Sequence, residues 1–143
     1  MEQNENMISN EIKLLDIYFK SIRFNQVRGA NGNIKLDIKH RFEIAKSNDK
    51  HNVKLTIITS ITSSDMRIDL EVQSVGVFTV ENNEEMDDKM PQIMVNTLYP
   101  FVRSQIQLIT SQPGLLPIML PIGTPRINKE PVLESMNDGS IIA

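Results

Sequence analysis

Strict alternation of apolar and polar residues in the middle of the chain constrains its fold more than any other feature. Over 34–44 every second residue belongs to one set, whose apolar members are Ile34, Leu36, Ile38, Phe42 and Ile44. His40 takes the remaining position of that set, and the positions between are all charged. Because successive side chains of a strand point to opposite faces, this pattern predicts a strand with one buried face.

Two further strands follow at short intervals. Residues 53–61 are rich in β-branched side chains, which suit a pleated surface. Residues 66–72 alternate again, and Gly76 predicts a bulge before the strand resumes over 77–80. Short polar turns separate these strands, so we predict an antiparallel meander.

The N-terminal part of the chain is ambiguous between helix and strand. A helical stripe would comprise five apolar residues: Ile8, Ile12, Leu15, Phe19 and Ile22. Residues 18–24, however, also alternate and are rich in strand-forming side chains. We therefore predict a strand over 12–24, followed by a loop at 29–32.

After the third strand of the meander the spacing becomes helical. A polar, acidic connection at 81–89 comes first. Apolar residues then recur every three or four positions, at Met86, Met90, Ile93, Met94, Leu98, Phe101, Val102, Ile106 and Ile109. Proline is tolerated only in the first turn of a helix, so Pro100 places the start at Asn96 or Thr97. We predict a helix from there to about Ser111, with a break or kink near its start.

The segment 114–123 is the most unusual in the chain. Between its prolines and glycines every residue is apolar: Leu115, Leu116, Ile118, Met119, Leu120 and Ile122. Pro117 and Pro121 exclude a regular helix and disfavour a central strand. We therefore predict an extended segment whose side chains cover an apolar surface. Such a segment loses little entropy when it lines a groove, and it has backbone groups for an extended peptide.

Composition excludes several classes of function. The 143 residues fit one domain, and the absence of cysteine removes disulfides and zinc–thiolate sites. A net charge of −3 without a basic stripe predicts no nucleic-acid binding. The sequence has neither a signal peptide nor an apolar run long enough for a bilayer. We therefore expect a cytoplasmic protein that does not insert into a membrane.

Signatures of catalysis and metal binding are also missing from the sequence. His40 lies on a predicted strand and His51 in a turn, and a lone histidine there is more often structural than catalytic. The acids within 81–88 lack the spacing and the turn glycine of a calcium loop. We expect no catalytic residue, no metal site and no cofactor.

Four methionines add apolar surface that can adapt its shape: Met86, Met90, Met94 and Met119. Methionine is unbranched and polarisable, and methionine-rich surfaces accept varied partners. The same residues could instead fill the core or a subunit interface, because helical apolar stripes usually pack inward. Both interpretations stay open on the sequence alone.

Three stretches, taken in their order, resemble one known family. Residues 17–24 (IYFKSIRF) resemble its first strand, and residues 70–78 (LEVQSVGVF) its glycine-bearing fourth strand. Residues 96–103 (NTLYPFVR) resemble its helix-opening aromatic–proline–arginine pattern, and a crossover rich in proline and leucine follows at 115–122. Over roughly residues 12–127 the chain is therefore similar to the SecB family of bacterial protein-export chaperones.

The resemblance implies an α+β fold with a four-stranded antiparallel sheet, one long helix and an extended, proline-rich crossover loop. Residues 1–127 would form the SecB-like chaperone domain, and residues 128–143 a mostly flexible tail. The family assembles as a homotetramer, a dimer of dimers, in which first strands pair between subunits and the helices pack between two sheets. The residues that we expect at this interface are Leu98, Phe101, Val102, Ile106 and Ile109.

The resemblance also implies a function that is not enzymatic. Unfolded clients such as preproteins would bind in apolar grooves beside the crossover, without ATP, and be kept competent for export. The expected client-binding residues are Val77, Phe78, Leu115, Leu116, Ile118, Met119, Leu120 and Ile122.

The chain departs from the family where the SecA translocation motor would bind. Members that engage SecA carry acids on the exposed sheet face of the first strand, and the matching positions here are Ser21 and Asn25. Asp69 and Glu71 are the remaining candidates for motor contact. An alternative is therefore a chaperone of the same fold dedicated to one client, such as the antitoxin of a toxin–antitoxin–chaperone system. A small β-rich domain that binds one apolar small molecule is another.

Overall fold

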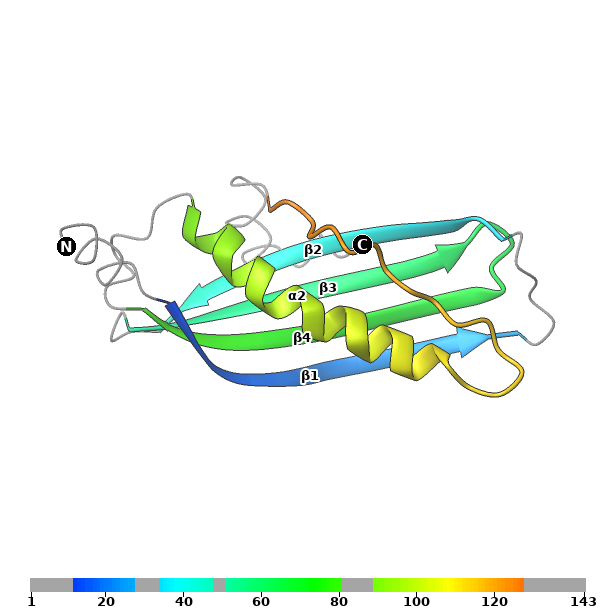
Figure 1. The fold of residues 1–143 in the computed structure, drawn as a ribbon, viewed down its shortest axis with the longest axis horizontal. Coiled ribbons are helices and arrows are strands. Elements are labelled where there is room, and N and C mark those ends of the chain that lie inside the picture. The colour runs from blue at the N-terminus through cyan, green and yellow to red at the C-terminus, as the bar shows by residue number, and fades with distance from the viewer. Residues whose placement is uncertain (1–11, 28–33, 48–50, 81–88, 128–143) are drawn as a thin grey trace.

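The computed structural model of the protein describes residues 12–27, 34–47, 51–80 and 89–127. Its elements in chain order are β1 (Ile12–Gln26), β2 (Leu36–Lys46), β3 (Asn52–Ser63), β4 (Ile68–Val80) and α2 (Lys89–Thr110). Figure 1 shows α2 lying diagonally across the sheet. The predicted loop at 29–32, the acids of 81–88 and the tail at 128–143 lie outside the described residues.

The strands form one antiparallel sheet in the order β1-β4-β3-β2. β3 and β4 are central, and the side chains that they turn toward α2 are almost fully buried, as at Leu55, Leu70 and Phe78. We call this side of the sheet the covered face, and the other side the opposite face. The predicted architecture of four antiparallel strands and one helix is confirmed.

The pairing of β1 with β4 explains why the sequence of β1 fits both a helix and a strand. Its register with β4 shifts between Leu14 and Asp16 and again between Phe19 and Ser21. Each shift inserts one extra residue into β1. The side chains that face α2 therefore step by three residues at each shift, as from Leu14 to Ile17, and by two residues elsewhere. This mixture of two- and three-residue steps imitates a helical stripe, although the element is a strand as predicted.

The bulge predicted at Gly76 is wrong, because β4 pairs with β3 through Gly76 without any shift in register. The glycine serves the packing of α2 instead. A Cβ at Gly76 would lie 2.9 Å from Cε1 of Phe78 and 3.3 Å from both methyl carbons of Leu98. The missing side chain therefore leaves room for Leu98 of the helix to pack directly on the sheet.

The predicted start of the helix is also wrong. α2 begins at Lys89 and continues through Pro100 for 22 residues, without an interruption at 96–100. The hydroxyl of Thr97 donates to the carbonyl of Ile93 (2.9 Å) one turn earlier in the helix, so Thr97 lies within α2 and not at its start. Pro100 is exposed, and its missing N–H leaves the carbonyl of the equally exposed Asn96 accessible to water. The local cost of proline is thus offset by the packing of the apolar stripe of α2.

That apolar stripe packs on the covered face of the sheet. The helix residues that it buries are Met90, Met94, Val95, Leu98, Tyr99, Val102, Ile106 and Thr110. Two of the four methionines singled out above, Met90 and Met94, therefore lie in the core of the chain. Among the residues that the structure describes, no helix has the length and apolarity needed to cross a membrane.

Adding a methyl group at Gly76 tests the contact between sheet and helix. We expect Gly76→Ala to lower the free energy of unfolding by about 1–3 kcal/mol, because Phe78 or Leu98 must shift to make room. Gly123→Ala is the matched control, since a Cβ there has nothing within 4 Å. Urea unfolding at one protein concentration measures both, and equal stability of the two variants would contradict the packing described.

Candidate functional site

The segment after α2 turns back and runs beside the helix in the opposite direction. Gly114 has a φ of 82°, a backbone conformation that suits glycine, and the N–H of Leu115 bonds the carbonyl of Gln112 (3.0 Å). Residues 115–122, which we call the crossover, then belong to no helix or strand. Figure 1 shows the segment returning across the sheet, from the end of β1 toward β2.

Side chains of the crossover alternate between the core and the solvent. Ile118 and Leu120 are each 3% exposed and belong to the core, whereas Met119 is 63% and Ile122 82% exposed. Leu116 packs against the core from a half-buried position. The crossover thus covers the core with one side and presents apolar side chains to solvent with the other.

Polar side chains from two elements hold the first half of the crossover by its backbone. Gln26, at the end of β1, accepts from the N–H of Leu116 (2.7 Å), and its amide nitrogen donates to the Leu116 carbonyl (3.4 Å). The hydroxyl of Thr110, in the last turn of α2, accepts from the N–H of Ile118 (2.8 Å) and donates to the carbonyl of Ile106 (2.8 Å).

Three residues of α2 hold the rest of the segment in the same way. Arg103 Nε donates to the carbonyl of Leu120 (3.1 Å), and the hydroxyl of Tyr99 donates to the carbonyl of Pro121 (3.4 Å). Gln92 donates to the carbonyl of Pro125 (3.0 Å) and accepts from the N–H of Ile127 (2.9 Å). We call Gln26, Gln92, Tyr99, Arg103 and Thr110 the tether row. All of its bonds to the segment are made to main-chain groups.

His40 links β2 to β3 and to α2. Its Nδ1 lies 3.0 Å from the hydroxyl of Thr59, and its ring meets that of Tyr99 edge to face at 5.6 Å. Burial lowers the pKa of His40 and raises that of Tyr99, so both side chains are neutral near pH 7. In the described part of the chain, no three His, Asp or Glu side chains gather where they could hold a metal ion.

The structure separates the eight residues expected to bind clients into three groups and one residue that lies apart from them. Phe78 is buried in the core with Ile118 and Leu120, and the exposed pair is Met119 and Ile122. Leu115 and Leu116 are half-buried. Val77 stands apart, because it neighbours Phe78 on β4 and therefore points to the opposite face. There it lines a cavity of ≈ 280 Å³ together with Ala45, Val53 and Lys54.

The residues expected at a subunit interface also differ in their burial. Leu98, Val102 and Ile106 are fully buried against the sheet of their own chain, and Ile109 is half-buried. Of that set, Phe101 alone is exposed. The solvent side of α2 carries two further exposed apolar residues, Ile93 and Leu108. Ile93 was part of the predicted apolar stripe, whereas the sequence pattern did not single out Leu108.

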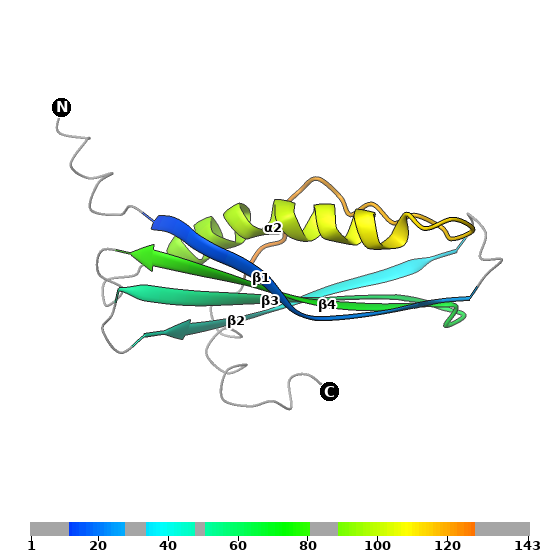
Figure 2. The ribbon, with the colours of Figure 1, turned by 90° about the horizontal axis from the view of Figure 1, so that it is seen from below.

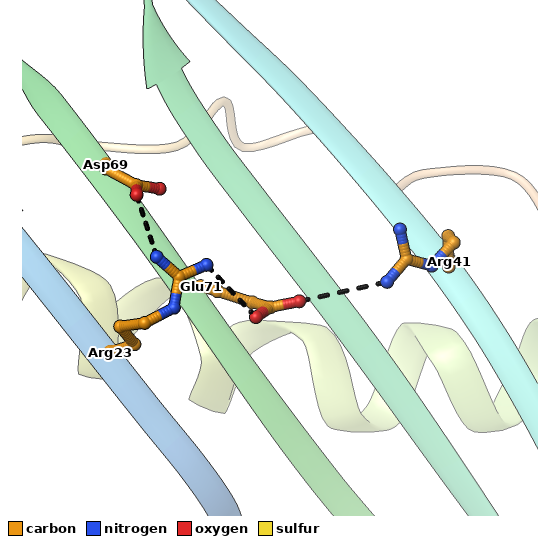
Figure 3. A network of polar contacts seen from close by, with 4 residues as sticks. All are labelled: Arg23, Arg41, Asp69 and Glu71. Carbon is orange, nitrogen blue, oxygen red and sulfur yellow. Dashed lines mark hydrogen bonds and ion pairs between the residues drawn. The ribbon is translucent and has the colours of Figure 1, made fainter. Parts of the chain in front are cut away.

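The opposite face carries an ion-pair network, shown in Figure 3. Arg23 on β1 donates to Asp69 (2.7 Å) and to Glu71 (3.2 Å) on β4, and these bonds raise its pKa. Glu71 also lies 3.8 Å from a guanidinium nitrogen of Arg41, which reaches it across β3. Both acids considered for motor contact are therefore paired with arginine.

Known proteins support the fold and identify the family. One family description, "Preprotein translocase subunit SecB", matches residues 2–123. No curated protein matches the sequence significantly. A Mycobacterium tuberculosis SecB-like chaperone, solved in complex with a ChAD peptide from the HigA1 antitoxin, has a TM-score of 0.65 and 14% identity, covering 79% of this chain and 90% of that one. A Streptococcus agalactiae protein of unknown function reaches a TM-score of 0.43 at 8% identity, covering 79% and 98%.

The match extends from residue 2 to the end of the crossover and so includes every strand, the helix and most of the segment held by the tether row. The likeness to the mycobacterial structure supports a SecB-like fold for the four strands and one helix of this chain. The chain belongs to the SecB family.

Proposed function

We propose that this protein is an ATP-independent cytoplasmic chaperone that binds unfolded polypeptides in apolar grooves and keeps preproteins competent for export. Membership of the SecB family carries the proposal. The mycobacterial SecB-like chaperone supports it, because that protein was solved with a peptide bound. Capture of this kind requires no covalent bond to be made or broken, so the protein needs neither a catalytic residue nor a cofactor.

Clients first meet the protein at the solvent side of the crossover. Met119 and Ile122 are apolar and largely exposed on a segment that is held in place along its backbone. Burial of apolar surface is worth roughly 25 cal/mol per Å², without regard to sequence. Methionine adapts its shape to different partners. This pair therefore suits a surface that must accept many unfolded chains.

Replacing the exposed pair tests the proposal. We expect the wild type to suppress aggregation of a chemically denatured protein without nucleotide, as measured by light scattering. The double variant Met119→Asp, Ile122→Asp should lose at least tenfold in client affinity, because the charges cannot enter an apolar contact. Its circular dichroism should match the wild type, since both positions are exposed.

Met66→Asp is the matched control for that experiment. Met66 is 67% exposed in the turn between β3 and β4, belongs to neither the crossover nor the tether row, and its φ of 63° is one that aspartate tolerates. We expect this variant to capture clients as the wild type does. If the double variant and the control behave alike, clients contact another surface, and a wild type that leaves aggregation unchanged refutes the chaperone proposal.

The chaperone is proposed to act as a homotetramer, with the solvent side of α2 at the interface between subunits. Phe101 and Leu108 are large, apolar and exposed on that side. We expect Phe101→Asp with Leu108→Asp to reduce the mass measured by light scattering without unfolding the subunit. Ile106→Asp should instead unfold it, because Ile106 is buried within the chain. A wild type that is monomeric at micromolar concentration would contradict the assembly.

A dedicated chaperone for one client, such as an antitoxin, is the second candidate. The ion-pair network favours it, because Arg23 and Arg41 neutralise the acids that a basic motor would contact. Exposed ion pairs contribute only about 0–1 kcal/mol each, so docking on this face needs several unpaired acids together. The opposite face offers Asp69 and Glu71 only in paired form.

Calorimetric titration with SecA from the same organism, at two salt concentrations, separates the two candidates. We expect weak binding or none by the wild type, and stronger binding by Arg23→Ala, which releases Asp69 and removes one of the two arginines paired with Glu71. Client capture should be unchanged in that variant. Tight, salt-sensitive binding by the wild type that Glu71→Lys abolishes would show that export through SecA is the function.

A further inference from the structure

We infer that the tether row is a binding site for the backbone of an extended polypeptide. In the free protein it is occupied by the crossover and the five residues that follow it, up to Ile127, and after their displacement it is occupied by an unfolded client. The inference rests on the proposed function and adds the site and the exchange. The site is built by Gln26 of β1 and by Gln92, Tyr99, Arg103 and Thr110 of α2.

The first argument is that the tether row contacts groups that every polypeptide has. Its bonds go to the N–H of Leu116, Ile118 and Ile127 and to carbonyls along the same segment. The amides of Gln26 and Gln92 each donate one bond and accept another. A side-chain amide used in this way satisfies an extended backbone whatever its side chains are.

The second argument comes from the spacing of the buried side chains. Leu116, Ile118 and Leu120 contact the core at every second position, which is the period of any extended strand. No tether bond requires a proline, because the row uses only the carbonyl of Pro121 and Pro125. A client with apolar residues at every second position would therefore bury the same surface and make the same bonds.

The third argument is that the crossover can leave without breaking a sheet. In the described part of the chain its one backbone–backbone hydrogen bond is that from Leu115 to Gln112, in the turn that precedes it. β2 and β3 pair over their full length independently of it. Exchange then replaces one set of tether bonds and apolar contacts by an equivalent set, so the difference in free energy between the two occupants is small.

Hydrogen exchange on the wild type tests this directly. The probe is reduced, carboxamidomethylated α-lactalbumin, which stays unfolded in buffer. We expect the amides of Leu116 and Ile118 to exchange faster when the probe is bound, because the backbone of the probe then occupies their acceptors on Gln26 and Thr110. Amides of β3 should be unchanged. Slower exchange at Leu116 and Ile118 would show that the crossover stays in place as a wall of the site, and would overturn the exchange.

Weakening the contact between the crossover and the core gives the second test. Ile118→Ala removes a buried anchor of the crossover and leaves the tether row intact. If the crossover competes with clients, affinity for the probe should rise severalfold, up to the limit set by the fraction of molecules that are already open. Met66→Ala, at an exposed position outside the crossover and the tether row, should leave affinity unchanged. A fall in affinity in Ile118→Ala would overturn the exchange.

A third measurement needs no client. In the free protein the amides of Leu116 and Ile118 should exchange at least tenfold faster than those of Leu55 and Ile57, because the crossover opens locally. Equal exchange rates would mean that the crossover leaves only when the whole chain unfolds, which overturns the inference. A wild type that binds no probe refutes the proposed function as well, whereas binding with slowed exchange refutes the displacement alone.

Discussion

The contact between Leu98 and the bare backbone of Gly76 sets the arrangement of the rest of the chain. Because β4 has no side chain at this position, α2 lies close against the sheet along its buried stripe. Because α2 lies this close to the sheet, Tyr99 contacts the ring of His40, and Arg103 and Thr110 lie beside the segment that returns along the helix. A helix held farther from β4 would leave the tether row out of reach of the crossover.

The two faces of the sheet have different physical characters. The covered face is apolar and shared between α2 and the crossover (Figure 2), so its burial depends on a segment without secondary structure of its own. The opposite face is polar, with arginines and acids from three strands in contact. Two apolar residues on it, Ile58 and Val75, are nevertheless buried. A partner that binds the covered face must therefore compete with the chain itself, whereas a partner of the opposite face must compete with internal ion pairs.

The strands of the meander could be predicted from sequence because each has a single register and a strict period of two. β1 was harder, because two shifts in register disguise its period. The start of α2 could not be read from Pro100, since tertiary packing outweighs the local preference of one exposed residue. The tether row was not foreseen at all. Gln26 and Leu116 are 90 residues apart, and only the fold brings them together. The one local sign was a glutamine at an inward position at the end of a strand.

The pairing of β1 with β4 has a consequence for how the chain is made. Ile12 is the partner of Val80, so β1, which leaves the ribosome ahead of β2, β3 and β4, has no neighbour in this sheet until β4 has emerged. β2, β3 and β4 can associate in turn as they appear, each with the strand just before it. The apolar residues of β1 meanwhile remain in contact with solvent, and closing the long loop between β1 and β4 costs chain entropy before their contacts form. A nascent subunit of this family therefore passes through a stage in which it exposes the same kind of apolar, extended segment that the finished subunit is proposed to capture.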